Sequence, residues 1–252
     1  MNVSEEKEIK KEFQLERVVL FSDAVFAIII TIMVLDIRVP ESLRHANADE
    51  IKHAFGELIP KILAYCLSFF LVARYWQGHL KMFSVLKDYD TKLLGLNLFY
   101  LFSVTLFPFA VTLISGNINP EASIYVWGIY IYSGVVFLST ISQALLTRYL
   151  MKNREKLCFD TDDLDSVLKY KVMRANFIIV PVVIIIMFAL SYLGFTQYYA
   201  LSALAIYGFL TSVIEKNYYP ESTTGPIILK IFKRRNRGLL KKAPHKKVIV
   251  KK

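Results

Sequence analysis

Long apolar blocks separated by short charged segments dominate this sequence. A helix needs ~20 mostly apolar residues to cross the hydrocarbon of a bilayer. In all, 55% of the residues are hydrophobic and the mean hydropathy is +0.42, whereas a soluble domain is usually ~45–50% apolar. The pattern therefore predicts an all-α membrane protein with six transmembrane helices per chain. The six blocks cover residues about 17–37, 56–80, 92–115, 123–149, 172–194 and 197–215.

The charge of the segments between the blocks predicts their orientation. If both termini lie on one side, that side holds the loop 152–156 and the tail, which has twelve basic residues from Lys216 onward. The opposite side holds the segment 38–55 and the loops 116–122 and 194–197, of which the last two contain no Lys or Arg. Because cytoplasmic loops carry the excess of Lys and Arg, we expect a multi-pass protein of the cell membrane with both termini in the cytoplasm.

We expect one membrane domain, residues 1–215, followed by a basic cytoplasmic tail, residues 216–252. The tail fits two interpretations equally well. It is either a solvated orientation signal or a contact with anionic lipid, near which each juxtamembrane basic residue adds ~1 kcal/mol of attraction.

Several classes of function find no support in the sequence. The formal net charge of +10 comes mostly from the tail, which lacks the interleaved aromatic residues of single-strand binders, so no nucleic-acid partner is expected. The chain has no P-loop, HExxH or GxSxG motif, which argues against an enzyme, and no cofactor is expected. His79 has no second His or Cys at ligand spacing, so it predicts no metal site. Cys66 lies in an apolar block and Cys158 in a charged loop, so we expect no disulfide.

Polar residues inside the apolar blocks are the candidates for function, because ionisable groups in a membrane segment are costly and rare. Several of them lie toward the expected cytoplasmic ends of their blocks and are expected to lie at one depth. A structural network that joins helices through hydrogen bonds is favoured over a proton relay. The residues at that depth are Arg17, Asp23, His79, Asn97 and Arg174; Lys61 and Arg74 lie elsewhere in the second block.

The first block separates its acid from one apolar stripe. At ~100° per residue, Ile28, Thr31, Ile32 and Leu35 share a stripe, and Asp23 points ~140° away from Ile28. The periodicity alone fits a helix that faces lipid, packs in a core or lines a pathway. It therefore leaves the role of the stripe open.

Three short motifs occur in order on the first three blocks: 17-RVVLFSD-23, 76-WQGH-79 and 97-NLFYLFSVTLFPF-109. Together they resemble the transmembrane protein 175 family of potassium channels, known from lysosomes, bacteria and archaea. The first motif fits the family signature R-x-x-x-F-S-D at the entrance of the first helix. The last three blocks are similar to the family in number and apolar character only.

The resemblance implies a homotetramer whose first helices line the pore, without the re-entrant selectivity-filter loop of ordinary potassium channels. It implies the tightest apolar constriction at Ile28, a preference for potassium at Thr31, and further apolar layers at Ile32 and Leu35. Behind the pore helix it implies a structural network. That network comprises Arg17, Ser22, Asp23, His79 and Asn97, with Trp76 packed nearby.

The predicted function is passive conduction of potassium through a pore with a hydrophobic gate at Ile28. The expected partners are potassium ions, the lipid bilayer and further copies of the chain, with no metal beyond the permeating potassium. The main alternative is a proton-coupled membrane transporter that uses Asp23 and His79 as its relay. A membrane scaffold without conductance is a third interpretation.

Overall fold

The computed structural model describes residues 3–37, 47–115, 123–159, 164–192 and 199–219, and every structural statement below concerns those residues. They are helical almost throughout and contain no strand beyond an isolated bridge between Leu86 and Cys158. The all-α prediction is therefore confirmed. The helices are α1 (Val3–Met33), a short 3-10 turn η1 (Val34–Asp36), α2 (Ala48–Phe83), α3 (Thr91–Thr105), α4 (Phe107–Ser115), α5 (Ser123–Lys152), α6 (Arg154–Leu157), α7 (Leu164–Leu168), α8 (Tyr170–Tyr192) and α9 (Tyr199–Tyr218).

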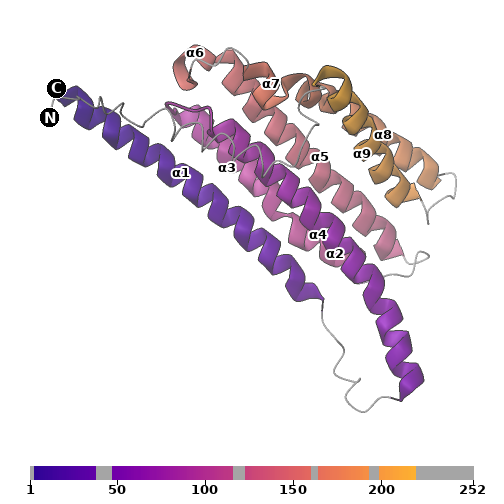
Figure 1. Ribbon diagram of the computed structural model, residues 1–252. Coiled ribbons are helices and arrows are strands. Elements are labelled where there is room, and N and C mark those ends of the chain that lie inside the picture. Colours follow the sequence, from indigo (N-terminus) through magenta and orange to yellow (C-terminus); the bar gives the residue numbers. More distant parts are fainter. Residues whose placement is uncertain (1–2, 38–46, 116–122, 160–163, 193–198, 220–252) are drawn as a thin grey trace, which may run out of the picture.

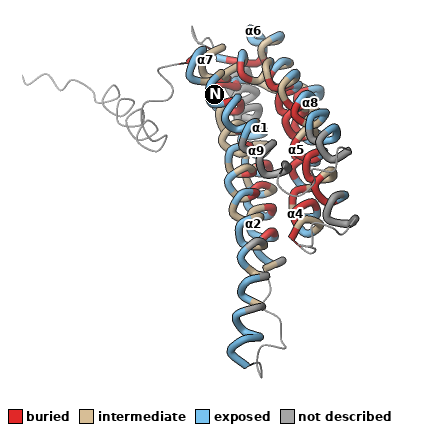
Figure 2. The backbone as a smooth tube through the Cα atoms, turned by 90° about the vertical axis from the view of Figure 1, so that its right-hand side faces the viewer, coloured by how far each residue is buried: buried red, intermediate tan, exposed pale blue. Residues whose placement is uncertain are grey.

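The long helices lie side by side along one common direction (Figure 1). Helix α1 packs on α2, α3 and α4, whereas α5 packs on α3, α4 and α8, and α9 packs on α8. Buried residues concentrate around α5, while the first turns of α2 extend beyond the bundle and are exposed (Figure 2). The largest fully buried side chains include Phe26, Met33, Tyr100 and Phe107, so α1, α3 and α4 contribute heavily to the core.

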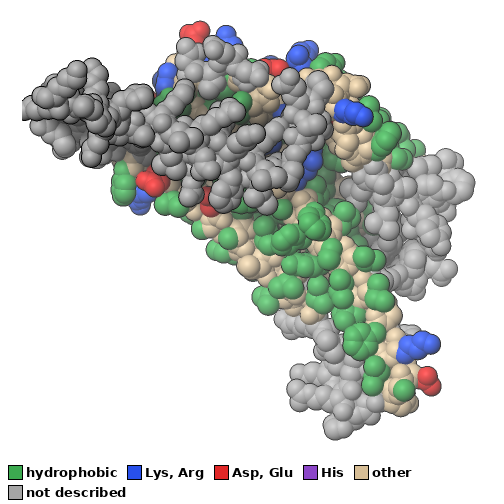
Figure 3. Space-filling model, viewed as in Figure 1, with side chains coloured by type: hydrophobic (Ala, Val, Ile, Leu, Met, Phe, Trp, Pro, Cys, Tyr) green, Lys and Arg blue, Asp and Glu red, His purple; other side chains and the backbone are tan. Residues whose placement is uncertain are grey.

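Three helical segments of the described residues are long and apolar enough to cross a membrane: Ala48–Phe83, Thr91–Ser115 and Trp127–Lys152. They coincide with the second, third and fourth predicted blocks. The other three blocks are helical in α1, α8 and α9 but are not among these segments, so the count of six spans stays a prediction. Apolar side chains cover much of the visible flank of the bundle, and charged ones gather toward its ends (Figure 3).

Two boundaries differ from the predicted ones for identifiable reasons. Helix α2 begins at Ala48 because Asn47 and Glu50 form a capping box. The Asn47 side chain accepts from the Glu50 N–H at 2.9 Å, and the Glu50 carboxylate accepts from the Asn47 N–H at 3.1 Å. The third block is two helices, α3 and α4, separated at Leu106. Pro108 lacks the N–H that would continue the helical ladder to Val104, which explains the break.

Some predictions fall on other parts of the chain. The loops 116–122 and 194–197, the first half of the segment 38–55 (residues 38–46) and the tail from residue 220 lie outside the described residues. The predicted orientation of the termini, which depends on these segments, therefore stays a prediction.

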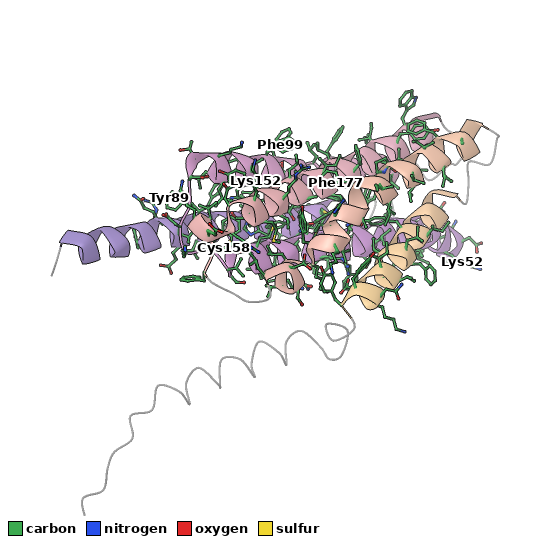
Figure 4. The ribbon with its side chains drawn as sticks, turned by 90° about the horizontal axis from the view of Figure 1, so that it is seen from above. Lys52, Tyr89, Phe99, Lys152, Cys158 and Phe177 are labelled. Carbon is green, nitrogen blue, oxygen red and sulfur yellow. The ribbon has the colours of Figure 1, made fainter. Side chains whose placement is uncertain are left out.

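Asp90 ties α3 to α5 at one end of the bundle. Its carboxylate accepts from the Leu93 N–H at 2.8 Å, which caps α3, and from the Tyr149 hydroxyl at 2.8 Å. Lys156 Nζ lies 3.9 Å from Asp90 Oδ2. Tyr89 and Cys158 lie near this end and Lys52 near the other (Figure 4). Burial raises the pKa of Asp90, but the bonds from Leu93 and Tyr149 and the Lys156 charge outweigh it, so the pKa falls below its ordinary value of 3.8.

Asp90→Ala is expected to lower the free energy of unfolding by about 1 kcal/mol, because the first turn of α3 loses its cap. The lowered pKa means that the carboxylate contributes its stabilisation at pH values above 3.8, and that this contribution is lost as the pH falls through the lower folded value. Thermal unfolding of the protein in detergent between pH 3 and 7 measures both effects. Asp90→Asn is the control, since it keeps the capping oxygen but should remove the pH dependence that Asp90 contributes. Equal pH profiles for the Asp90→Asn variant and the wild-type protein would show that Asp90 is not the source of this pH dependence.

Candidate pore face and interhelical network

Helix α1 has a buried face and an exposed face. Ser22, Phe26, Ile29 and Met33 recur at helical spacing and are all nearly fully buried. On the opposite side, Ile28, Ile32 and Leu35 of the predicted stripe are 56%, 47% and 62% exposed in the single chain, and Thr31 is exposed beside them. An apolar stripe of this kind needs lipid or another protein surface against it.

Thr31 adds one hydroxyl oxygen to this stripe. Its hydroxyl lies 3.0 Å from the Ala27 carbonyl and 2.9 Å from the Ile28 carbonyl, so it donates its hydrogen to its own helix. The hydroxyl lone pairs therefore remain directed away from those carbonyls, on the exposed face of α1.

The predicted network residues form two separate sets of hydrogen bonds. In the first, Trp76 Nε1 on α2 donates to Asp23 Oδ1 on α1 at 2.8 Å. A bond from a neutral donor to a carboxylate is among the stronger hydrogen bonds in proteins. It fixes α1 against α2 at a half-buried position.

The second set joins three helices. Asn97 Nδ2 on α3 donates to Ser22 Oγ on α1 at 3.1 Å, and Ser22 Oγ donates to the Val18 carbonyl at 2.8 Å. The Asn97 amide oxygen lies 2.8 Å from His79 Nε2 on α2, and it accepts a hydrogen from that nitrogen. His79, Asn97 and Ser22 are at most 1% exposed.

His79 is held as a neutral ring. It stacks on Phe83 with 4.2 Å between ring centroids, and Phe26 and Tyr100 complete an aromatic enclosure. Its Nδ1 is buried and makes no hydrogen bond to the described residues. A proton on Nδ1 would leave a buried donor unsatisfied, which costs about 1–3 kcal/mol, so the proton resides on Nε2. No hydrogen bond among the described residues joins His79 to Asp23, which weighs against a relay through these two groups.

Arg17 and Arg174, which the sequence groups with these residues, make no hydrogen bond to either set within the described residues, although Arg17 lines a hollow that Asn97 also borders. Arg17 is exposed and borders an open hollow between α1 and α3 with Phe21 and Tyr89, and no hydrogen bond links it to the network within the described part of the chain. Arg174 is exposed on α8, which packs on α5 and α9 rather than on α1. Arg174 therefore does not take part in the two hydrogen-bonded sets of the described residues.

Sequence reasoning missed the aromatic support of the network. Tyr100 is fully buried, and its hydroxyl donates to the Tyr75 carbonyl at 2.9 Å, which joins α3 to α2. Tyr75 in turn bonds to Thr140 on α5 at 2.9 Å. The spacing of Asn97 and Tyr100, three residues apart on one helix face, was a signal that could have identified Tyr100.

Comparison with known proteins bears on the same segment. Residues 17–108 match the family model described as "Endosomal/lysosomal potassium channel TMEM175". The predicted TMEM175 resemblance is confirmed. The matched segment contains every residue of the predicted pore and of the family's network, so the exposed stripe of α1 and both hydrogen-bonded sets lie within the part of the chain that matches TMEM175.

Individual TMEM175 relatives extend the comparison. The chain is 32% identical over 130 residues to a potassium channel of Chryseobacterium sp., an alignment covering 52% of this chain and 64% of that one. It is 34% identical over 110 residues to a potassium channel of Streptomyces collinus, covering 44% of this chain and 52% of that one. The chain thus spans about half to two thirds of the length of these relatives. The Homo sapiens relative, named "Endosomal/lysosomal proton channel TMEM175", is 28% identical over 134 residues, covering 53% of this chain and 25% of that one.

A solved structure agrees in fold. The crystal structure of a lysosomal potassium-selective channel TMEM175 homolog from Chamaesiphon Minutus superposes with a TM-score of 0.61 at 23% identity, covering 79% of this chain and 97% of that chain. This likeness concerns the fold alone. It extends past the family segment, so the helices after α4 also have counterparts in a TMEM175 fold.

Proposed function

We propose that this chain forms a passive, potassium-permeable cation channel whose pore is lined by α1. The TMEM175 match over residues 17–108 carries the proposal, because it covers the exposed stripe of α1 and the network behind it. The bacterial relatives are named potassium channels. The protein is a channel in this proposal and not an enzyme.

One copy of α1 cannot enclose a pathway, so the pore requires several copies around an axis. We propose a homotetramer with six transmembrane helices per chain, no re-entrant filter loop and both termini in the cytoplasm, located in the cell membrane. Residues 1–215 form the channel domain and residues 216–252 its basic tail. The exposed, apolar face of α1 supports this assembly, since contact with other copies would bury it.

The gate in this proposal is a ring of Ile28 side chains, one from each copy. Such a ring offers no oxygen to replace the water around an ion, so a narrow, dry ring is closed. Tilt or rotation of α1 widens the ring and admits water. Thr31 lies about one turn away and supplies hydroxyl oxygens, while Ile32 and Leu35 form further apolar layers. Potassium sheds its water more readily than sodium, so a partly dehydrating passage favours potassium.

The network sets the position of α1 relative to its neighbours in this mechanism. Asp23 is fixed to α2 through Trp76, and Ser22 is fixed to α2 and α3 through Asn97 and His79. All of these bonds lie on the side of α1 away from Ile28. The acid therefore supports the pore helix without facing the ion.

Single-channel recording of the purified full-length protein, with potassium and sodium on opposite sides of a bilayer, tests this function. A channel gives an ohmic current that reverses near the potassium equilibrium potential. A proton-coupled transporter that uses Asp23 and His79 gives a flux that follows an imposed pH gradient and saturates with a solute. Absence of any current would support the scaffold interpretation and reject the channel.

A further inference from the structure

A cavity of about 150 Å³ with a mixed polar and apolar wall lies between α2, α5, α8 and α9, away from the proposed pore face. A cavity of this size is large enough for several waters, since one water needs roughly 10–15 Å³ of such volume. Its wall includes three cationic side chains and one acidic side chain, so its charge is positive. They are Arg74, Lys81, Lys169 and Glu215.

Glu215 is clamped between two of these cations. Lys169 Nζ donates to Glu215 Oε1, and Arg74 Nη2 donates to Glu215 Oε2 at 3.1 Å. The side chains of Lys169 and Glu215 are only 19% and 14% exposed, whereas that of Arg74 is 64% exposed. Arg74 and Lys169 thus share one carboxylate, so these three side chains carry a net positive charge without counting Lys81.

Lys169 is held in an unusual backbone conformation. Its φ is +50°, and it is the one non-glycine residue of the described chain with a positive φ. A lysine in this region costs of order 1 kcal/mol or more, and such strain persists where the surrounding structure imposes it. The junction between α7 and α8 therefore places the Lys169 ammonium at the cavity against its local preference.

Uncharged polar groups complete the wall. Gln143 and Asn176 are 4% and 7% exposed, and Asn176 Oδ1 makes no hydrogen bond to the described residues. A Cβ added to Gly78 would lie 2.1 Å from Gln143 Nε2, so the glycine makes room for this amide. The cavity therefore offers an amide donor beside its cations and an open acceptor for a protonated oxygen or a water.

The charged wall lies toward one end of the bundle. Lys81 is in the last turn of α2, Lys169 precedes α8 and Glu215 is near the end of α9, at the end where α6 and α7 lie (Figure 1). Arg74 lies about two turns deeper on α2. In the predicted orientation this end faces the cytoplasm, where anionic lipid headgroups lie.

We propose that this cavity binds a phosphate group, either as the free ion or as the headgroup of an anionic lipid. An anion offsets the excess positive charge, the Gln143 amide donates to its oxygens, and Asn176 Oδ1 accepts from a protonated oxygen. A cationic ligand would meet repulsion from Arg74, Lys81 and Lys169. This site is separate from the pore and does not rest on the proposed channel function.

The test measures binding to the full-length protein in detergent. Inorganic phosphate is titrated at constant ionic strength against chloride while thermal unfolding is followed. In a second arm, native mass spectrometry compares dioleoyl phosphatidic acid with dioleoyl phosphatidylcholine. We expect saturable binding of phosphate, of phosphatidic acid, or of both, and no binding of phosphatidylcholine. Binding of inorganic phosphate would identify the free ion as a ligand. Binding of phosphatidic acid alone would identify the lipid headgroup as the ligand.

Charge variants separate this site from general surface attraction. Lys81→Gln, which leaves both partners of Glu215 in place, should weaken binding roughly fivefold, as expected for one nearby charge. Glu215→Gln should strengthen binding by a similar factor because it removes the competing carboxylate. Lys152→Gln, an exposed lysine on α5 outside the cavity (Figure 4), is the matched control and should change nothing.

Three outcomes would overturn the proposal: no binding of either phosphate source, equal weakening by Lys81→Gln and Lys152→Gln, or weakening by a folded Glu215→Gln variant. If Glu215→Gln does not fold, the comparison of Lys81→Gln with Lys152→Gln decides alone. Binding readouts do not require conductance, so failure of this site and failure of the channel proposal are distinguishable.

Discussion

Ile28→Asn should raise the potassium conductance of the resting channel at least about tenfold and lower its preference for potassium over sodium. Amide groups at the constriction hydrogen-bond to water and stabilise a hydrated pore, where isoleucine side chains favour a dry one. Lowering the barrier to permeation by about 1.4 kcal/mol is sufficient for a tenfold effect. Bilayer recording, or potassium flux from liposomes with a sodium comparison, measures both quantities.

Ile178→Asn is the matched control for this substitution. Ile178 is also highly exposed in the single chain, but it lies on α8, away from the proposed pore. Its replacement should leave conductance and ion preference unchanged. If Ile28→Asn behaves like this control in a correctly assembled protein, the gate is not at Ile28.

Asn97→Ala should destabilise the folded chain by about 3 kcal/mol, with little change in the ion preference of the protein that still folds. The substitution leaves the buried Nε2–H of His79 without its acceptor and removes the donor to Ser22 Oγ, which keeps its own bond to the Val18 carbonyl. A buried polar group left without a hydrogen bond costs about 1–3 kcal/mol. Reversible unfolding in mixed micelles with increasing denaturing detergent measures the change in free energy.

Thr105→Ala controls for substitution on the same helix. Thr105 is exposed at the end of α3, and its hydroxyl donates to the Phe102 carbonyl of its own helix. Its loss should change stability by less than about 0.5 kcal/mol. A stable Asn97→Ala protein with altered ion preference would instead place the network in selectivity rather than in structure.

The sequence predicted the elements well because they depend on local properties. In lipid, a single block of about twenty apolar residues can hydrogen-bond all of its backbone polar groups within the segment only by forming a helix. The separation of Asp23 from the Ile28 stripe also followed from helical spacing. Pro108 could have predicted the break at Leu106, and the capping box of Asn47 and Glu50 could have predicted the start of α2, although hydropathy indicates neither.

The partners of the polar groups were harder to predict. A common depth for Asp23, His79 and Asn97 would not have identified their partners, because Asp23 bonds to Trp76, whereas His79 bonds to Asn97. The Arg74–Glu215 pair joins residues 141 positions apart, and no local pattern connects them. The family resemblance, rather than spacing, assigned Ile28 and Thr31 to a pore.

The sequence by itself determined that this chain folds into helices along its apolar blocks, and that Asp23 on the first helix points away from the Ile28 stripe. These properties follow from composition and from the 100° step of an α-helix, both of which are local. The tertiary structure alone decided which helices cross at which rotation, and therefore which buried donors meet which acceptors. That choice is global, because a hydrogen bond between helices requires the packing of whole apolar faces to bring two atoms within about 3 Å.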